Sequence, residues 1–275
     1  MTATPQQVAA HYDRGGLAQA VLDALKAAGK DLDKLTPDDL APMDEFHGRG
    51  RQATVELAEL VKVSAQDRVL DVGCGIGGPS RFLAHQYGCR VSGLDLTPAF
   101  IETAQMLVGR LKLGHLVDYR QGTALALPFP DASFDLVWSQ NVAMNIADRQ
   151  RYYGEMRRVV KPTGRIGISE VLAGPNGAPY LPAPWARDPD ASFVLSEAEV
   201  RAAMAKAGLK VVTWVDTTDA SQGHSQRRAA TIGNLPALGI HVILGAATPE
   251  IFATGQRSYA DGRMRSMTAM LARAD

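Results

Sequence analysis

Residues 69–80 read VLDVGCGIGGPS, a run of apolar and β-branched residues that leads into a glycine-rich turn. The turn holds Gly73, Gly75, Gly77 and Gly78, and RFLAHQY follows it with the spacing of a helix. A strand, a glycine turn and a helix start in that order bring backbone N–H groups close to a bound ligand. Three of the glycines also fit the G-x-G-x-x-G pattern of dinucleotide-binding folds, but similar turns serve S-adenosylmethionine and other adenosine ligands.

Short apolar segments alternate with helical patterns after this turn. Five of them are RVLDVG, CRVSGLDL, VDYRQG, FDLVWSQ and RIGISEVLA, all within residues 68–173. Buried strands that alternate with helices indicate a parallel sheet with right-handed crossovers. We expect GLKVVTWVDT (208–217) as a sixth strand and RMRSMTAMLAR (263–273) as a seventh, with a helix as the alternative for the last. The sequence predicts an α/β protein with a doubly wound, Rossmann-like, seven-stranded and mostly parallel sheet.

Residues 1–65 precede this pattern and are predicted to form an N-terminal helical cap. Helical spacing occurs in VAAHYDR, LAQAVLDALKAAGK and RQATVELAELVKV. The intervening LTPDDLAPMDEFHGRG (35–50) contains two prolines, so we expect an irregular segment that folds over the ligand. Residues 66–275 would then be the ligand-binding domain.

Two parts of this second domain interrupt the alternation. The stretch AGPNGAPYLPAPWARDPDASF (173–193) is rich in proline, which excludes a regular element. It is either a lid over the pocket, spanning about residues 173–195, or a surface connection whose aromatic residues fill the edge of the core. A further insertion is expected at about residues 219–262.

Composition limits the classes of function. The chain has 29 Lys and Arg against 29 Asp and Glu, and a zero formal charge argues against a general nucleic-acid binder. No apolar run approaches the roughly 18 residues of a membrane helix, and the N-terminal residues lack a signal-peptide pattern. The two cysteines, Cys74 and Cys89, fit no metal site, and we expect no disulfide. We therefore expect a cytoplasmic monomer or homodimer with no membrane or nucleic-acid partner.

Two aspartates bear on the choice of ligand. Asp95 ends the segment VSGLDL, where a carboxylate can accept hydrogen bonds from both ribose hydroxyls of NAD or of S-adenosylmethionine. Asp71 precedes the glycine turn, where a carboxylate would repel a pyrophosphate. It suits a ligand with an ammonium group and no phosphate. S-adenosylmethionine has that ammonium group beside its sulfonium centre, so the sequence predicts it as the cofactor.

Four segments resemble successive motifs of class I S-adenosylmethionine-dependent methyltransferases. They are DVGCGIGGPSRFLA, GLDLTPAFIETA, GTALALPFPDASFDLVWS and RRVVKPTGRIGISE, and the resemblance covers about residues 66–172. The run PFPDASFDLV is the most specific of them. DLAPMDEFHGRGRQATVELAEL and the PAPW loop also resemble the small-molecule branch that includes sarcosine/dimethylglycine, ubiquinone/menaquinone and geranyl-diphosphate methyltransferases.

The resemblance implies roles for several residues around the cofactor. Gly73, Gly75 and Gly77 would let the backbone approach the methionine moiety, Asp95 would bind the ribose, and Leu96 would lie against the adenine. Thr123 and Ala124 would flank the adenine, and Gln140 would lie near the methyl group. Thr123 stands where many relatives have an aspartate that binds the adenine amino group.

Candidates for the chemistry come from outside the glycine turn. Methyl transfer from a sulfonium releases a neutral thioether, so the protein mainly aligns the acceptor and excludes water. Glu170, at the end of the fifth strand, is either a base or part of a salt bridge. His47 is either catalytic or packs against a helix. The substrate-binding candidates are Trp185, Asn145, Tyr12 and Arg49.

Other residues received weaker assignments. His11, His224 and His241 rank lower as catalytic candidates, and Arg227–Arg228 is typical of an ordinary charged helix face. The leading prediction is methyl transfer to an N, O or C atom of a small molecule, with S-adenosylhomocysteine as the product. The alternatives are methylation of RNA or protein, a non-catalytic S-adenosylmethionine-binding protein, and an NAD-dependent oxidoreductase.

Overall fold

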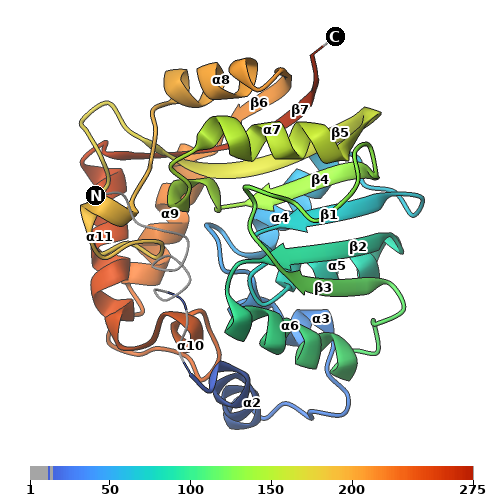
Figure 1. Cartoon of the computed structure of the whole chain (residues 1–275). Coiled ribbons are helices and arrows are strands. Elements are labelled where there is room, and N and C mark those ends of the chain that lie inside the picture. Colours follow the sequence, from blue (N-terminus) through green and yellow to red (C-terminus); the bar gives the residue numbers. More distant parts are fainter. Residues whose placement is uncertain (1–11, 13–14, 275) are drawn as a thin grey trace.

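The computed structural model describes residue 12 and residues 15–274 (Figure 1). Within them, one sheet has the strand order β3-β2-β1-β4-β5-β7-β6, in which β7 alone runs antiparallel to its neighbours. The strands are β1 (Arg68–Val72), β2 (Arg90–Asp95), β3 (Val117–Gln121), β4 (Phe134–Gln140), β5 (Val160–Ala173), β6 (Leu209–Asp216) and β7 (Met264–Arg273). The expected seven-stranded, mostly parallel sheet is confirmed, and the last segment is a strand.

Helices cover both faces of the sheet. They are α2 (Leu17–Ala27), α3 (Pro37–Asp44), α4 (Arg51–Leu60), α5 (Gly78–Tyr87), α6 (Pro98–Arg110), α7 (Arg149–Val159), α8 (Glu197–Lys206), α9 (Thr218–Ala229), α10 (His241–Leu244) and α11 (Thr248–Ala260). Strand side chains alternate between the two faces. Val69 and Trp138 pack with α4, α5 and α6 on one face, whereas Leu70 and Val137 pack with α7 and α8 on the other.

The segment 35–50, which was expected to be irregular, contains the helix α3. α3 forms because Thr36 caps it: the Thr36 side chain accepts from Asp39 N–H, and the Asp39 carboxylate accepts from Thr36 N–H. Pro37 lies in the first turn, where its missing N–H costs nothing. Residues 45–50 do lack regular structure. The expectation of an irregular segment was therefore wrong for residues 37–44.

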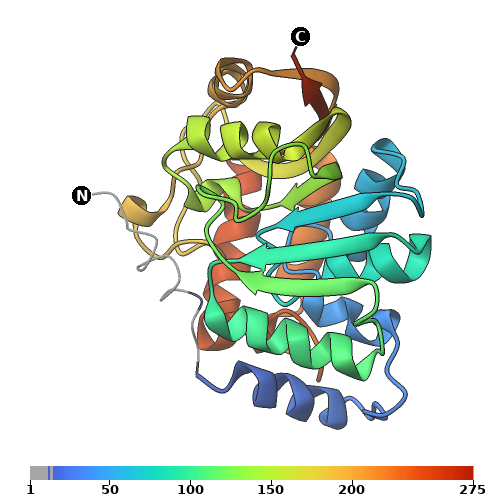
Figure 2. The same ribbon diagram turned by 45° about the vertical axis from the view of Figure 1, so that its right-hand side comes forward.

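The regions outside the sheet pack around it. α2 runs alongside α6 (Figure 2), and α4 shares the core of the sheet face that it covers. The helix expected at VAAHYDR lies, apart from Tyr12, outside the described residues. The insertion between β6 and β7 forms α9, α10 and α11, and these lie together at the carboxyl ends of the strands (Figure 1). The domain boundary at residue 65 stays a prediction.

Candidate active site

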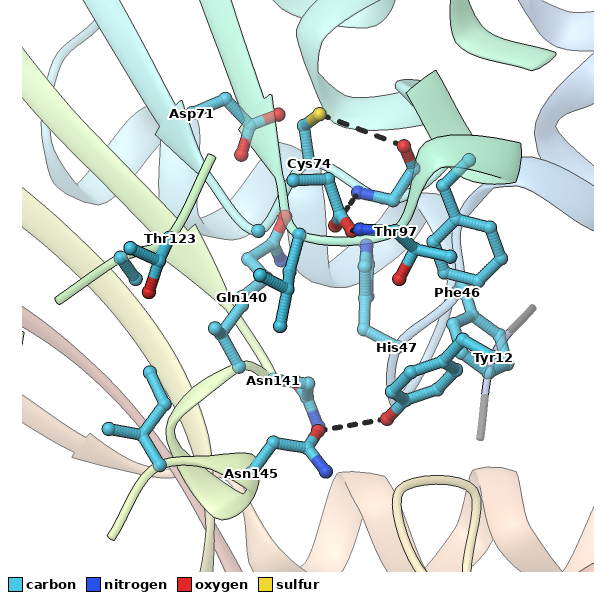
Figure 3. Close-up of a pocket in the computed structure, with 18 of the residues that line it drawn as sticks. Tyr12, Phe46, His47, Asp71, Cys74, Thr97, Thr123, Gln140, Asn141 and Asn145 are labelled. Atoms are coloured by element: carbon cyan, nitrogen blue, oxygen red, sulfur yellow. Dashed lines mark hydrogen bonds between the residues drawn. The ribbon is translucent and has the colours of Figure 1, made fainter. Parts of the chain in front are cut away.

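A cavity of about 320 Å³, here called the first cavity, lies where β1, β2 and β4 end (Figure 3). Its walls are the glycine turn, the residues that follow β2, β3 and β4, the segment 44–47, and Tyr12. Figure 3 places Asp71 at one end of the cavity and the pair Tyr12 and Asn145 at the other. The carboxyl edge of a parallel sheet is where open α/β folds bind ligands.

Glycines of the turn differ in what they do. Gly73 and Gly75 line the first cavity with φ angles of 75° and 55°. A Cβ on Gly73 would collide with the side chain of Val142, whereas a Cβ on Gly75 would have no atom within 4 Å. The space beside Gly75 is therefore open for a ligand. Gly77 is not among the lining residues, and a Cβ there would collide with Tyr119, so Gly77 serves the turn itself.

Two of the predicted cofactor residues form the acidic part of the first cavity. Asp71 is buried and accepts a hydrogen bond of 2.6 Å from the Ser80 hydroxyl. The pKa of Asp71 is raised to about 7. Burial is the main cause and the nearby Asp95 adds to it, whereas the Ser80 hydrogen bond acts to lower the pKa. Asp95 accepts from Gly75 N–H and Thr97 N–H, each over 2.9 Å, and burial raises its pKa as well.

A third carboxylate in this cavity was missed by the sequence analysis. Asp44, at the end of α3, pairs with Arg81 over 2.8 Å, and its Oδ1 is buried without a hydrogen-bond partner among the described residues. The described lining residues of the first cavity include four aspartates (Asp44, Asp71, Asp95 and Asp148) and no lysine or arginine. Asp44 already has Arg81 as its counter-charge, but a cation would stabilise the ionised forms of Asp71 and Asp95, so the cavity suits a positively charged ligand.

Leu96, Thr123, Ala124 and Gln140 all line the first cavity. Gln140 Oε1 accepts from Trp138 Nε1 over 3.0 Å and from the Thr54 hydroxyl over 3.2 Å. Its Nε2 is buried and has no partner in residue 12 or residues 15–274, so one amide donor in the cavity wall is unused there. The sequence resemblance thus points to residues that the fold brings together.

A second cavity, of about 110 Å³, adjoins the first and shares Tyr12, Phe46, His47 and Asn141 with it. Its other walls come from α9, α11 and the proline-rich stretch, including Trp185. Trp185 is buried among Met144, Val171 and Met264, and its Nε1 donates to Ser192. Trp185 therefore both fills the edge of the core and lines a cavity, which were alternatives in the sequence.

Asn145 joins the two cavities. Its Oδ1 accepts from the Tyr12 hydroxyl over 2.8 Å, and its Nδ2 donates to the Trp185 carbonyl over 2.8 Å. Asn145 lines the first cavity and Trp185 the second. This amide therefore links Tyr12 to the proline-rich stretch.

His47 lines both cavities, but its ring nitrogens are engaged. Nε2 lies 2.9 Å from Glu45 Oε2, and Nδ1 lies 3.2 Å from the Gly48 carbonyl. Burial acts to raise the pKa of Glu45, but hydrogen bonds and charges from His47, Arg51 and Thr54 outweigh it and lower the pKa. His47 can take a proton from a substrate only if it gives up one of these contacts.

Glu170 does not lie with the other candidates. β5 continues to Ala173, because its last residues pair with β7, so Glu170 lies inside the strand and not at its end. The carboxylate accepts from Tyr153 over 2.7 Å and from Arg149 over 3.3 Å, and it lines neither cavity. Burial raises the pKa of Glu170, and the charge of Arg149 and the bond from Tyr153 only partly offset this rise. The salt-bridge alternative describes what the structure has.

Arg49 also lies outside both cavities. Its guanidinium is buried and pairs with Glu56 on α4 over 2.6 Å. By contrast, His224 and Arg228 on α9 line the second cavity, although the sequence ranked the first low and assigned the second to a charged helix face. Arg227 is exposed as expected. His11 lies outside the described residues.

Other expectations concern groups that do not line a site. Both cysteines are free and buried, and Cys74 lines the first cavity. Among the described residues, no group of His, Cys, Asp and Glu side chains could hold a metal ion. In the same part of the chain, no helix is long and apolar enough to cross a membrane.

Comparison with known proteins finds a domain model and several relatives that match part of the chain. Residues 70–168 match the family model described as a methyltransferase domain. Over 134 residues the chain is 35% identical to "Methyltransferase GfsG" of Streptomyces halstedii, covering 49% of this chain and 48% of that protein. The chain spans less than half the length of the first curated relatives that it matches.

Two solved structures share the fold at low sequence identity. The [4+2]-cyclase SpnF has a TM-score of 0.75 at 22% identity, covering 100% of this chain and 97% of that one. Geranyl diphosphate C-methyltransferase of Streptomyces coelicolor A3(2), in complex with S-adenosyl-L-homocysteine, has a TM-score of 0.68 at 22% identity, covering 82% and 78%. The architecture is the class I methyltransferase fold.

Proposed function

We propose that this protein transfers a methyl group from S-adenosylmethionine to a small molecule, because residues 70–168 match the model of the methyltransferase domain. The product would be S-adenosylhomocysteine, and the acceptor would be an N, O or C atom. GfsG is named a methyltransferase, and the geranyl diphosphate enzyme binds S-adenosyl-L-homocysteine in its crystal, which supports this class of reaction.

The proposal rests above all on the acidic first cavity. Asp71 and Asp95 line it without a lysine or arginine beside them, and Asp95 accepts from the N–H of Gly75, where the space is open. S-adenosylmethionine has a sulfonium and an ammonium group against one carboxylate, so it supplies the missing positive charge. NAD would bring a pyrophosphate to the same carboxylates, and that repulsion argues against an oxidoreductase.

We assign the cofactor contacts to the residues that line this cavity. Asp71 would hold the ammonium group, and Asp95 would accept from the ribose while it keeps Gly75 N–H and Thr97 N–H in place. Leu96, Thr123 and Ala124 would surround the adenine. The unused amide of Gln140 would face the reacting end of the cofactor.

Catalysis in this proposal depends on alignment and exclusion of water. The cofactor supplies the methyl group on a sulfonium, whose leaving group is a neutral thioether. The second cavity adjoins the first at His47 and Asn141, so an acceptor held there would face the cofactor site. Tyr12, Asn145 and Trp185 are linked by hydrogen bonds across this region and would close it.

A small-molecule acceptor fits this site better than RNA or protein. The second cavity is small, about 110 Å³, and the whole chain has no excess of positive charge. The cytoplasmic location and the monomeric or homodimeric state stay predictions from the sequence.

The test combines binding with turnover. Calorimetry should detect S-adenosylmethionine and S-adenosylhomocysteine binding and no NAD binding. A panel of small phenols, amines and enols, followed by release of S-adenosylhomocysteine, should then identify an acceptor. Binding of NAD in preference to S-adenosylmethionine would overturn the proposal. Cofactor binding without release of S-adenosylhomocysteine for any acceptor would favour the non-catalytic alternative.

A further inference from the structure

The two adjoining cavities have opposite charge. The first is lined by aspartates without a lysine or arginine, and the second has Arg228 and His224 in its described lining without any aspartate or glutamate. Arg228 and His224 both come from α9, and the third basic side chain of the described lining is His47 at the shared wall. The first cavity therefore favours a cationic ligand, whereas the second favours an anionic one.

Arg228 is the charged group of the second cavity. Within the part of the chain that the structure describes, its guanidinium is in no ion pair with a carboxylate, and its Cζ lies 5.9 Å from the centre of the Phe252 ring. Burial lowers the pKa of Arg228 to about 10, so the side chain stays charged at neutral pH. A half-buried cation without a carboxylate partner is costly, and an anionic ligand would relieve that cost.

His224, one turn before Arg228, supplies an unused hydrogen-bonding atom. Its Nε2 is buried in the wall and has no partner among the described residues. Burial, together with the charges of Arg228, Arg227 and Arg49, lowers the pKa of His224 to about 3. The ring is therefore neutral, so it can donate one hydrogen bond to an anion without adding charge.

The remaining walls of the second cavity are mostly apolar. They include Val171, Trp185, Ile251, Phe252 and Met264. Such a surface suits an aromatic or alicyclic body, because apolar and aromatic contacts are what this lining offers. The polar groups lie on α9 along one wall, so they would fix the orientation of such a body.

We infer that the second cavity binds an apolar acceptor through an anionic oxygen, a phenolate or enolate or a carboxylate, held by Arg228 and His224. This inference rests on the proposed function, since it assigns the acceptor to the cavity beside the cofactor. The inference adds a substrate class to the proposed function: the cationic cofactor and the anionic acceptor occupy adjoining cavities of opposite charge. Electrostatic attraction then favours their joint binding.

Binding of matched probes to the protein saturated with S-adenosylhomocysteine tests this. The probes are 2-naphthoate, 2-naphthol, 2-naphthalenemethanol and 2-naphthylmethylammonium, measured by calorimetry at one ionic strength. We expect naphthoate or naphthol to bind at least tenfold more tightly than the neutral alcohol and the ammonium. A preference for naphthoate identifies a carboxylate, and a preference for naphthol that grows with pH identifies an acidic hydroxyl.

Variants on α9 test whether Arg228 causes the preference for anionic probes. Arg228→Met should abolish it, His224→Phe should weaken it, and Arg227→Met, which removes an exposed arginine next to Arg228, should leave it unchanged. Unchanged S-adenosylhomocysteine affinity in all three variants shows that the fold and first cavity are intact. Equal binding of the four probes, binding of none, or a preference that survives Arg228→Met would overturn the inference. Failure of S-adenosylhomocysteine to bind the wild type would instead contradict the proposed function.

Discussion

The Tyr12 hydroxyl donates a 2.8 Å hydrogen bond to Asn145 Oδ1, and these residues are separated by 133 positions in the chain. The same amide donates from Nδ2 to the Trp185 carbonyl. Asn145 therefore holds an N-terminal residue and the proline-rich stretch in one arrangement. Tyr12 also packs its ring against Phe46 and Phe100 at the edge of the first cavity, so the hydrogen bond fixes a side chain that lines the site.

Replacing Asn145 should loosen this closure. Asn145→Ala removes two hydrogen bonds, each contributing about 0.5–1.5 kcal/mol. We expect kcat/KM to fall about tenfold, which corresponds to about 1.4 kcal/mol. Tyr12→Phe removes only one of the bonds and should have a smaller effect.

The matched control for Asn145 is Asn176→Ala. It removes an exposed amide that donates to the Asp261 carbonyl elsewhere in the proline-rich stretch. Kinetics with a saturating cofactor concentration would distinguish the two variants. Equal losses in both would mean that Asn145 has no special role in closing the site.

Asp71 gives a prediction with a pH dependence. The unfolded chain ionises an aspartate near pH 4, whereas burial raises the pKa of Asp71 in the folded protein to about 7. Between these values the folded protein holds a proton that the unfolded chain has released, so this group makes stability fall as pH rises. Asp71→Asn should therefore raise the Tm of the ligand-free protein at pH 8 more than at pH 5.

The same variant should bind the cofactor less well. Only the ionised form of Asp71 attracts an ammonium group, so the loss of S-adenosylmethionine affinity in Asp71→Asn should grow as pH rises from 6 to 7.5. We expect at least a tenfold loss at the upper value, measured by calorimetry. Asp118→Asn, which changes an exposed carboxylate on β3, is the control and should match the wild type. A loss that is independent of pH would contradict an ion pair at Asp71.

Gly75 tests whether the open space at the turn belongs to a ligand. Gly75→Ala puts a methyl group where the structure has no atom within 4 Å, at a φ of 55°. The strain costs roughly 1–2 kcal/mol of stability. Gly29→Ala imposes the same kind of strain at a φ of 72°, also in open space, at the exposed end of α2. We expect similar losses of Tm in both variants, with cofactor affinity reduced at least tenfold only in Gly75→Ala. Normal affinity in that variant would make the turn a purely structural one.

Local patterns were sufficient for most of the fold. Buried strands are apolar runs separated by helical spacing, so each of the seven strands could be located from the sequence. The start of β5 could not, because residues 160–164 contain Pro162 and Gly164 and resemble a turn; their pairing opposite Phe134 is a tertiary contact. α3 was missed for a similar reason, since its capping box is overlooked when two prolines are taken as breakers.

Some residues of the two cavities could likewise be predicted from the sequence, and others could not. Asp71, Gly75 and Asp95 could be predicted, because the topology of a parallel sheet brings the ends of adjacent strands together. Arg228 could not. On α9 it neighbours an exposed arginine, and only the packing of α9 against α11 and β7 turns it toward the second cavity. Burial of a single charge in an insertion depends on contacts between distant segments, which no local pattern contains.

Variants of Glu170 test whether this residue has a structural or a catalytic role. Its carboxylate is buried between Tyr153 and Arg149, away from both cavities. Glu170→Gln leaves the buried Arg149 without a counter-charge, and breaking such a pair costs about 3–5 kcal/mol. Asp131→Asn, which removes the exposed partner of Arg158, should cost less than about 1 kcal/mol.

We therefore expect Glu170→Gln to lower the free energy of unfolding far more than Asp131→Asn does, while kcat per folded molecule changes less than twofold. Tyr153→Phe, which removes one hydrogen bond to the same carboxylate, should lie between them at about 1 kcal/mol. Urea unfolding and active-site titration with the cofactor give the two quantities separately. The opposite pattern, a stable Glu170→Gln variant whose turnover is lost together with the acidic limb of its pH–rate profile, would identify Glu170 as the base.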